Sequence, residues 1–253
     1  MPNGNGHFTL DYKRLKDICL RAYHAFEDGK GIFRHKERLL PQWALPSDFE
    51  FDPKREETRL PQEAGNYLWV LVGLERRSQT RENIKNGLRT WKNLETRWIF
   101  DPREVVAHNF GEIEEFIQSQ FKYMMNGFPE SFLYNNEKLL REFEGYAKNI
   151  VDGQTVEIAR ARLMEFKGIG SGIANLYIIQ CTDRKIAEVK DPEEIKLKID
   201  VHKSRIPTNT EAVNPVNNSV RRDVLEPVLE EKYLQICREE SLNGGRLDSA
   251  LWM

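Results

Sequence analysis

The sequence is poor in cysteine and contains no long apolar run. Its 253 residues include only three cysteines, Cys19, Cys181 and Cys237, which are scattered along the chain. An odd, scattered set argues against a disulfide framework, and three thiols cannot complete a four-thiolate iron–sulfur cluster. No apolar stretch approaches the roughly 20 residues that span a bilayer, and the N-terminus does not have the pattern of a signal peptide. We therefore expect an intracellular protein, in the cytoplasm or, in a eukaryote, in the nucleus.

The sequence also lacks the charge excess and the ligand spacings that mark several classes of protein. The formal net charge is −2 and the isoelectric point is near 6.3, so the overall composition does not indicate nucleic-acid binding. A local basic face would nevertheless be sufficient for such binding. No cluster of His, Cys and Glu has the spacing of a zinc site, and no phosphate-loop motif is present. We find no internal repeat and no βαβ pattern.

What the sequence does contain is a series of helical patterns. Apolar side chains recur at the spacing of one helix face in many segments, and Asp101-Pro102 is a typical helix start. The proline-containing segment 28–61 instead predicts an irregular arm with a minor strand pair. The pattern as a whole predicts an all-α protein. The helices are expected at 8–27, 62–75, 81–94, 130–150, 217–241 and 244–253, with a further start at Asn109.

The most informative stretch runs from Thr155 to Asp200. An amphipathic helical pattern that Thr155 can cap is followed by Gly168-Ile-Gly170, and Ser171 can cap a second, apolar helix. Two helices joined by such a turn form a backbone site for an anion. Glycine lets the chain approach a phosphate closely, while the second helix points free N–H groups and the positive end of its dipole at the same place.

The segment that follows, Lys198-Ile-Asp-Val-His-Lys-Ser-Arg-Ile206, places one acid in an apolar and basic setting. Together, the turn and this segment resemble the helix-hairpin-helix superfamily of DNA glycosylases, the enzymes of base excision repair. The Asp-Val-His form is most similar to the 8-oxoguanine glycosylase branch. The matching residues are Phe166, Gly168, Ile169, Gly170 and Ala174 in the hairpin, and Ile199, Asp200, His202 and Arg205 beyond it.

Three features depart from the family pattern. Lys167 stands where the family usually has a proline. The interval before the acid is longer than usual, and the charged segment 183–198 that fills it is expected to be a surface insertion. Bifunctional relatives carry a nucleophilic lysine at the position of Gly172, so the resemblance implies a monofunctional enzyme in which water attacks the sugar. The alternative is a lyase that uses a lysine at another position, for which the candidates are Lys167, Lys196, Lys198 and Lys203.

The resemblance implies a role for each matched position. Asp200 would be the catalytic carboxylate, which stabilises the positive charge that develops on the sugar and steers a water molecule. The residues alone leave open that Asp200 is the N-cap of a helix beginning at Val201. The resemblance also implies a monovalent cation at the hairpin, held by the backbone carbonyls of Met164, Phe166 and Ile169. The residues expected to contact DNA are Gly168, Gly170, Gly172, His202, Lys203, Arg76, Arg77 and Gln79.

Each of these DNA contacts has an alternative interpretation. Arg76-Arg-Ser-Gln79 stands where the family carries a loop that wedges into the minor groove, but the residues alone fit a solvated turn equally well. His202 is otherwise a surface histidine, and Lys203 is expected only to attract phosphate in general. A base pocket needs apolar or aromatic walls, yet most large aromatics are simply core. The candidates for that pocket are Trp69, Tyr67, Tyr123, Phe110 and Trp252.

The resemblance implies two helical lobes, with the helix-hairpin-helix element flanking a central cleft. Residues 1–61 would pack with the C-terminal lobe, 62–183 would form a central lobe with the hairpin element at 155–181, and 184–253 would hold the insertion, Asp200 and the last helices. The expected partner is double-stranded DNA with a damaged or mismatched base, bound by a monomer without a membrane or any cofactor beyond the cation. The alternatives are a non-catalytic protein that keeps the hairpin as a phosphate clamp, and an all-α protein-interaction module.

Overall fold

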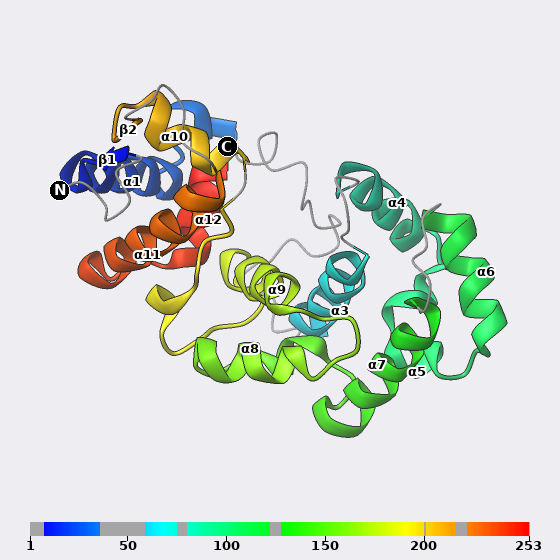
Figure 1. The fold of residues 1–253 in the computed structure, drawn as a ribbon. Coiled ribbons are helices and arrows are strands. Elements are labelled where there is room, and N and C mark those ends of the chain that lie inside the picture. Colours follow the sequence, from blue (N-terminus) through cyan, green and yellow to red (C-terminus); the bar gives the residue numbers. More distant parts are fainter. Residues whose placement is uncertain are drawn as a thin grey trace. The chain divides into compact units, whose positions relative to one another are not determined.

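The structure is a computed structural model that describes residues 8–35, 59–74, 80–121, 128–199, 201–215 and 222–252. Apart from one short two-stranded sheet this part of the chain is helical, so the predicted all-α class is confirmed (Figure 1). The chain divides into two compact units, which we call unit 1 (1–39 with 191–253) and unit 2 (40–190). The boundaries therefore lie at 39 and 190, whereas the sequence analysis placed them at 61 and 183. Within the described ranges no helix combines the length and apolarity needed to cross a membrane.

Unit 1 surrounds an apolar core to which its first and last helices both contribute. Leu15 and Cys19 are fully buried there with Tyr233 and Leu247. The first helix begins at Asp11, whose carboxylate accepts a hydrogen bond from the Arg14 N–H at 3.0 Å. The elements are β1 (Phe8–Leu10), α1 (Tyr12–Glu27), the 3-10 helices η1 (Gly31–His35) and η6 (Pro192–Glu194), α10 (Val201–Asn209), β2 (Val213–Pro215), α11 (Arg222–Glu240) and α12 (Gly244–Trp252).

The two prolines in 207–215 favour a loop over the whole of that segment, but only residues 210–212 form one. Helix α10 continues through Pro207, and residues 213–215 form β2, which pairs antiparallel with β1 so that Leu10 lies opposite Val213. Pro207 has no N–H to donate to the Lys203 carbonyl one turn earlier. The Tyr233 hydroxyl lies 3.5 Å from that carbonyl and donates to it instead, which helps the helix to tolerate the proline. The strand pair expected within 28–61 falls mostly outside the described residues.

Segment 183–198 is not a surface insertion. Ile186 and Ala187 are 2% and 3% exposed in unit 2, and Ile195 and Leu197 are 0% and 2% exposed in unit 1. In the second half the buried apolar residues alternate with exposed lysines, which is the pattern of an extended chain lying on a core. The sequence analysis predicted a surface segment because its many charged residues outweighed the few apolar positions between them.

Unit 2 is organised around α3, which is apolar and buried nearly all round, as predicted. It packs against α9, where the Tyr177 hydroxyl donates to the Gly65 carbonyl at 3.0 Å. The helix starts predicted at Asp101 and Asn109 are confirmed, since both side chains accept from a first-turn N–H. The elements are α3 (Arg59–Gly73), α4 (Thr80–Lys92), η4 (Arg97–Phe100), α5 (Pro102–Val105), α6 (Phe110–Phe121), α7 (Phe128–Phe143), η5 (Ala147–Ile150), α8 (Val156–Met164) and α9 (Ser171–Asp183).

Candidate functional site

Helices α8 and α9 pack against each other and are joined by a short turn, residues 165–170. Thr155 caps α8, with its hydroxyl accepting from the Ile158 N–H at 3.3 Å. Gly168 has φ +78°, a left-handed conformation that favours glycine. The cap of α9 is Gly170 and not Ser171, because the Gly170 carbonyl already accepts from the Ala174 N–H at 2.9 Å. The helix therefore begins one residue earlier than predicted.

The turn presents backbone to solvent at the N-terminus of α9. Gly168, Gly170 and Gly172 are exposed, whereas Phe166 beneath them is 2% exposed. A Cβ atom added at Gly170 or Gly172 would meet no other atom within 4 Å among the described residues, so this part of the chain leaves both positions open. The first N–H groups of a helix have no acceptor within that helix, and they carry the positive end of its dipole. The turn is therefore able to bind an anion such as a phosphate through its backbone.

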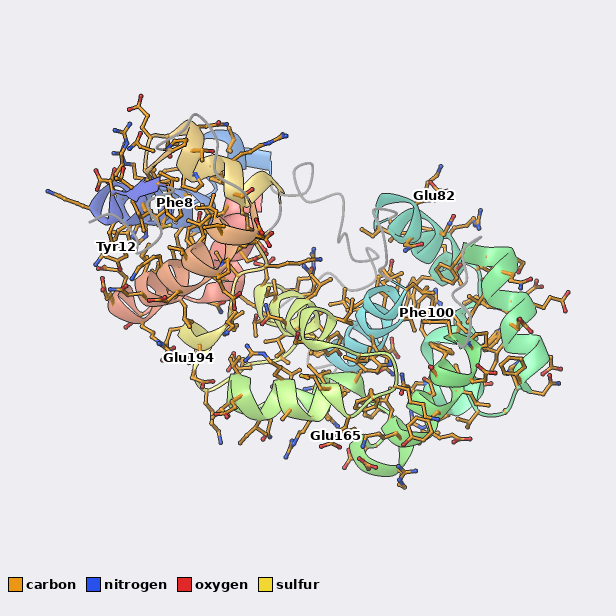
Figure 2. The ribbon with its side chains drawn as sticks, viewed as in Figure 1. Phe8, Tyr12, Glu82, Phe100, Glu165 and Glu194 are labelled. Atoms are coloured by element: carbon orange, nitrogen blue, oxygen red, sulfur yellow. The ribbon has the colours of Figure 1, made fainter. Side chains whose placement is uncertain are left out.

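Helix α7 also contacts this turn and fixes its backbone. The Asn135 side-chain amide donates to the Lys167 carbonyl and accepts from the Lys167 N–H, both at 2.9 Å. Lys138 Nζ lies 2.9 Å from Glu165 Oε2 and 2.9 Å from Glu142 Oε2, and these carboxylates raise the pKa of Lys138 (Figure 2 shows Glu165 at the turn). The sequence analysis predicted this helix within 130–150 but did not connect it with the turn, because the contact of Asn135 with Lys167 depends on how the two segments pack.

The backbone carbonyls predicted to hold a cation belong to Met164, the last residue of α8, and to Phe166 and Ile169 in the turn. The Phe166 carbonyl accepts from the Ile169 N–H at 3.2 Å. A carbonyl oxygen has two lone pairs, so this bond leaves one for a ligand. The cation stays a prediction.

Several predicted site residues lie outside the part of the chain that the structure describes. Asp200 is one of them, and α10 begins directly after it at Val201. The loop with Arg76, Arg77 and Gln79 and the side chain of His202 are the others. Their roles in catalysis and DNA binding stay predictions.

Lys203 requires a correction. It was expected to face phosphate, but it is 1% exposed, and its Nζ lies 2.8 Å from Asp248 Oδ1 inside unit 1. A side chain buried and paired in this way does not reach DNA, because α10 turns it toward α12. A hint was present in the sequence, since Asp248 is the one acid in the apolar pattern 244–253.

The Lys203–Asp248 pair also holds the chain that leads into Asp200. Asp248 Oδ1 accepts from the Lys198 N–H at 2.8 Å, and Lys203 Nζ donates to the Lys198 carbonyl at 3.0 Å. One turn earlier on α12, a Cβ atom at Gly244 would come within 2.2 Å of the Ile195 carbonyl oxygen. Segment 195–198 therefore lies directly against α12 and is fixed at both of its ends.

Two of the aromatic residues proposed for a base pocket belong to the core instead. Tyr67 is fully buried, and Trp69 is 5% exposed with its ring 4.9 Å from that of Phe166 and 5.4 Å from that of Tyr177. Phe110 is 37% exposed at the start of α6. Tyr123 and the side chain of Trp252 lie outside the described residues.

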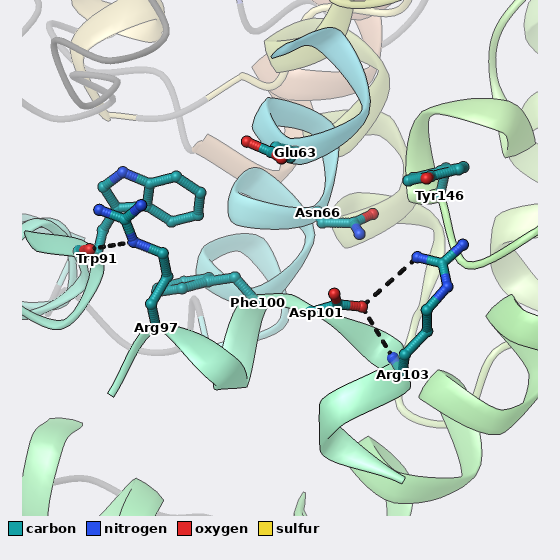
Figure 3. A pocket seen from close by; sticks show the side chains of 8 residues that line it. All are labelled: Glu63, Asn66, Trp91, Arg97, Phe100, Asp101, Arg103 and Tyr146. Carbon is teal, nitrogen blue, oxygen red and sulfur yellow. Dashed lines mark hydrogen bonds and ion pairs between the residues drawn. The ribbon is translucent and has the colours of Figure 1, made fainter. Parts of the chain in front are cut away.

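A cavity of about 490 Å³ lies within unit 2 (Figure 3). Arg97 stacks 4.5 Å above the Trp91 ring and donates to the Trp91 carbonyl at 2.7 Å. Arg103 lies 5.0 Å from the Tyr146 ring and donates to the Glu144 carbonyl at 2.9 Å. These guanidinium groups hold the end of α4 and the turn before η5, so much of the cavity's polar lining has a structural role. The lining residues are Glu63, Asn66, Trp91, Arg97, Phe100, Asp101, Arg103 and Tyr146.

The described residues offer no alternative metal or thiol chemistry of the usual kinds. Among them, no three His, Cys, Asp or Glu side chains come together as metal ligands. All three cysteines are buried and unpaired, and burial raises the pKa of Cys181 and of Cys237 to about 12. Near neutral pH these two thiols are therefore protonated and poor nucleophiles.

No protein-family model matches the sequence, and no curated protein matches it at a significant level.

Proposed function

We propose that this protein is a helix-hairpin-helix DNA glycosylase, which hydrolyses the N-glycosidic bond of a damaged or mismatched base. The observation that carries the proposal is the turn between α8 and α9, which is exposed, is left open at Gly170 and Gly172 by the described residues, and is held by α7. The resemblance in sequence adds Asp200, directly before α10. A turn of this kind binds the phosphates of a duplex whatever the base sequence, as an enzyme that inspects many sites requires.

The proposed reaction needs one carboxylate and one water molecule. The target base leaves the duplex, because its glycosidic bond is not accessible within the stack. As the bond between C1′ and the base nitrogen breaks, positive charge develops on the sugar, and the carboxylate of Asp200 stabilises it. Water adds to C1′, and its proton is transferred through Asp200 while the base departs and is protonated. Gly172 offers no amine for a covalent intermediate, so the enzyme is monofunctional.

A panel of duplexes that each carry one lesion tests this proposal directly. It includes an oxidised purine, an alkylated purine, a deaminated base and a mismatch, and base release is detected by alkaline cleavage at the abasic site. We expect release from at least one duplex and none from an undamaged control. A protein that binds every duplex and releases no base is the non-catalytic clamp protein, the second candidate, which the same turn supports.

Gly170→Asp is expected to weaken binding to any duplex by roughly a hundredfold, because it places a carboxylate where a phosphate binds. Gly170 has φ −88° and ψ 174° with free space around it, so a side chain fits without strain. As the N-cap of α9, it even gains a capping side chain from the substitution. Binding is measured by fluorescence anisotropy on an undamaged duplex.

Gly170→Ala is the matched control, since a methyl group fits the same free space but carries neither a charge nor an acceptor that would occupy the first N–H groups of α9. Its affinity should stay within about threefold of wild type, and melting temperatures should show that both variants are folded. Equal affinity of the aspartate variant and wild type would remove the turn from the DNA interface.

A further inference from the structure

We propose that Asn135 is a positioning residue for the turn: by pairing with the backbone of Lys167, it keeps the N-terminus of α9 in the conformation that receives a phosphate. This inference rests on the proposed binding of DNA by the turn. It assigns a function to α7, a helix that lies outside the segments that resemble the glycosylases. It also gives a physical reason for Lys167, which stands where those proteins usually have a proline.

The pairing uses both the amide nitrogen and the amide oxygen of the asparagine side chain. Asn135 is 6% exposed, and its amide group makes one hydrogen bond as donor and one as acceptor to a single residue, Lys167, both at 2.9 Å. This is the pattern by which two neighbouring strands pair, here made by a side chain. An aspartate has no donor and a leucine has neither group, so only an amide satisfies both partners. A proline at 167 would have no N–H to contribute.

The neighbouring residues of the turn are held by the same helix. Lys138 Nζ pairs with Glu165 and lies 5.4 Å from the centre of the Phe166 ring, and Lys167 Nζ lies 3.9 Å from the centre of the Tyr134 ring. Three consecutive residues of the turn, 165–167, therefore each contact a residue of α7. Glu165 and Lys167 are exposed, so without α7 only Phe166 would anchor this part of the turn.

Fixing the turn matters because its ligand is held by backbone groups. A flexible turn would have to lose conformational freedom when it binds a phosphate, and that loss reduces affinity. A turn already held by Asn135 presents its N–H groups in place. The asparagine thus acts on DNA binding through the turn and has no contact with the reacting atoms.

The test is Asn135→Asp, which removes the donor to the Lys167 carbonyl and places a carboxylate beside that oxygen. We expect a roughly tenfold increase in the Kd for an undamaged duplex. Hydrogen exchange of the Lys167 amide and of residues 168–172 should become faster. Once saturating enzyme has bound all of a lesion-bearing duplex, single-turnover base release should be close to the wild-type rate, because the reacting groups are unchanged.

Asn136→Asp is the matched control. Asn136 is the adjacent residue of α7, is 1% exposed, and donates to the Phe132 carbonyl at 2.8 Å within the helix, so it carries the same substitution without touching the turn. It should reduce the melting temperature but leave the Kd and the hydrogen exchange of the turn unchanged. If Asn135→Asp does not fold, the Asn135→Leu variant is used in every measurement instead. Leucine has a similar volume and removes both hydrogen bonds.

The possible outcomes separate the two proposals. If wild type does not bind a duplex, the proposed function is wrong and the positioning role is wrong with it. If wild type binds and the folded Asn135 variant binds equally well, the positioning role alone is wrong. If both asparagine variants raise the Kd equally, the effect comes from general weakening of α7, and the specific pairing with Lys167 is again wrong.

Discussion

Asp200→Asn is expected to slow base release by roughly 10²- to 10⁴-fold, because the substitution removes the negative charge that stabilises the cationic sugar and the group that accepts a proton from water. Duplex affinity should stay within about twofold of wild type, since an asparagine is similar in shape and adds no charge that repels phosphate. Rates are measured in single turnovers on the lesion-bearing duplex that the panel identifies.

The choice of asparagine separates catalysis from helix capping. Asn and Asp are nearly equal as N-caps, so a residue that only caps α10 would tolerate this change with normal activity. Asp11→Asn is the control, because Asp11 caps α1 in the same unit and the variant keeps that cap. It should retain wild-type rates. If Asp200→Asn also retains them, Asp200 is not the catalytic carboxylate.

Asp248→Ala is expected to reduce the free energy of unfolding by about 3–5 kcal/mol, since it leaves the charge of Lys203 buried without its partner. Lys203 is 1% exposed, and Asp248 also accepts from the Lys198 N–H, so the truncation removes an acceptor that these two donors share. Urea denaturation monitored by circular dichroism measures the loss. Part of the loss should be regained when Lys203→Met is added, because methionine fills the same space without a charge.

Glu230→Ala is the matched control for this stability effect. Its ion pair with Lys196 at 3.0 Å belongs to the same unit but is exposed, with 41% and 46% of the two side chains accessible. An exposed pair contributes at most about 1 kcal/mol, so the variant should unfold nearly as wild type does. If Asp248→Ala reduces the free energy of unfolding no more than Glu230→Ala does, the buried Lys203–Asp248 pair is not important for stability.

Local sequence patterns were enough to locate much of the helical structure and the turn between α8 and α9. Helix periodicity, the caps at Asp101 and Asn109 and the glycine at 168 all depend on residues within about one helical turn of each other. The same locality explains why α3 was correctly expected to be buried. Even here the sequence did not determine the first residue of α9. Gly170 and Ser171 are both acceptable N-caps, and only the backbone conformation decides between them.

Only the tertiary structure decided which partner each polar side chain finds. Asn135 meets Lys167, and Lys203 meets Asp248, across separations in sequence that no periodic pattern records. A lysine looks the same in the sequence whether its helix turns it toward solvent or toward an acid in the core. Local interactions form helices and turns, but the packing of helices against one another decides which charges are buried. The direction of Lys203, and the hold of α7 on the turn, follow from that packing alone.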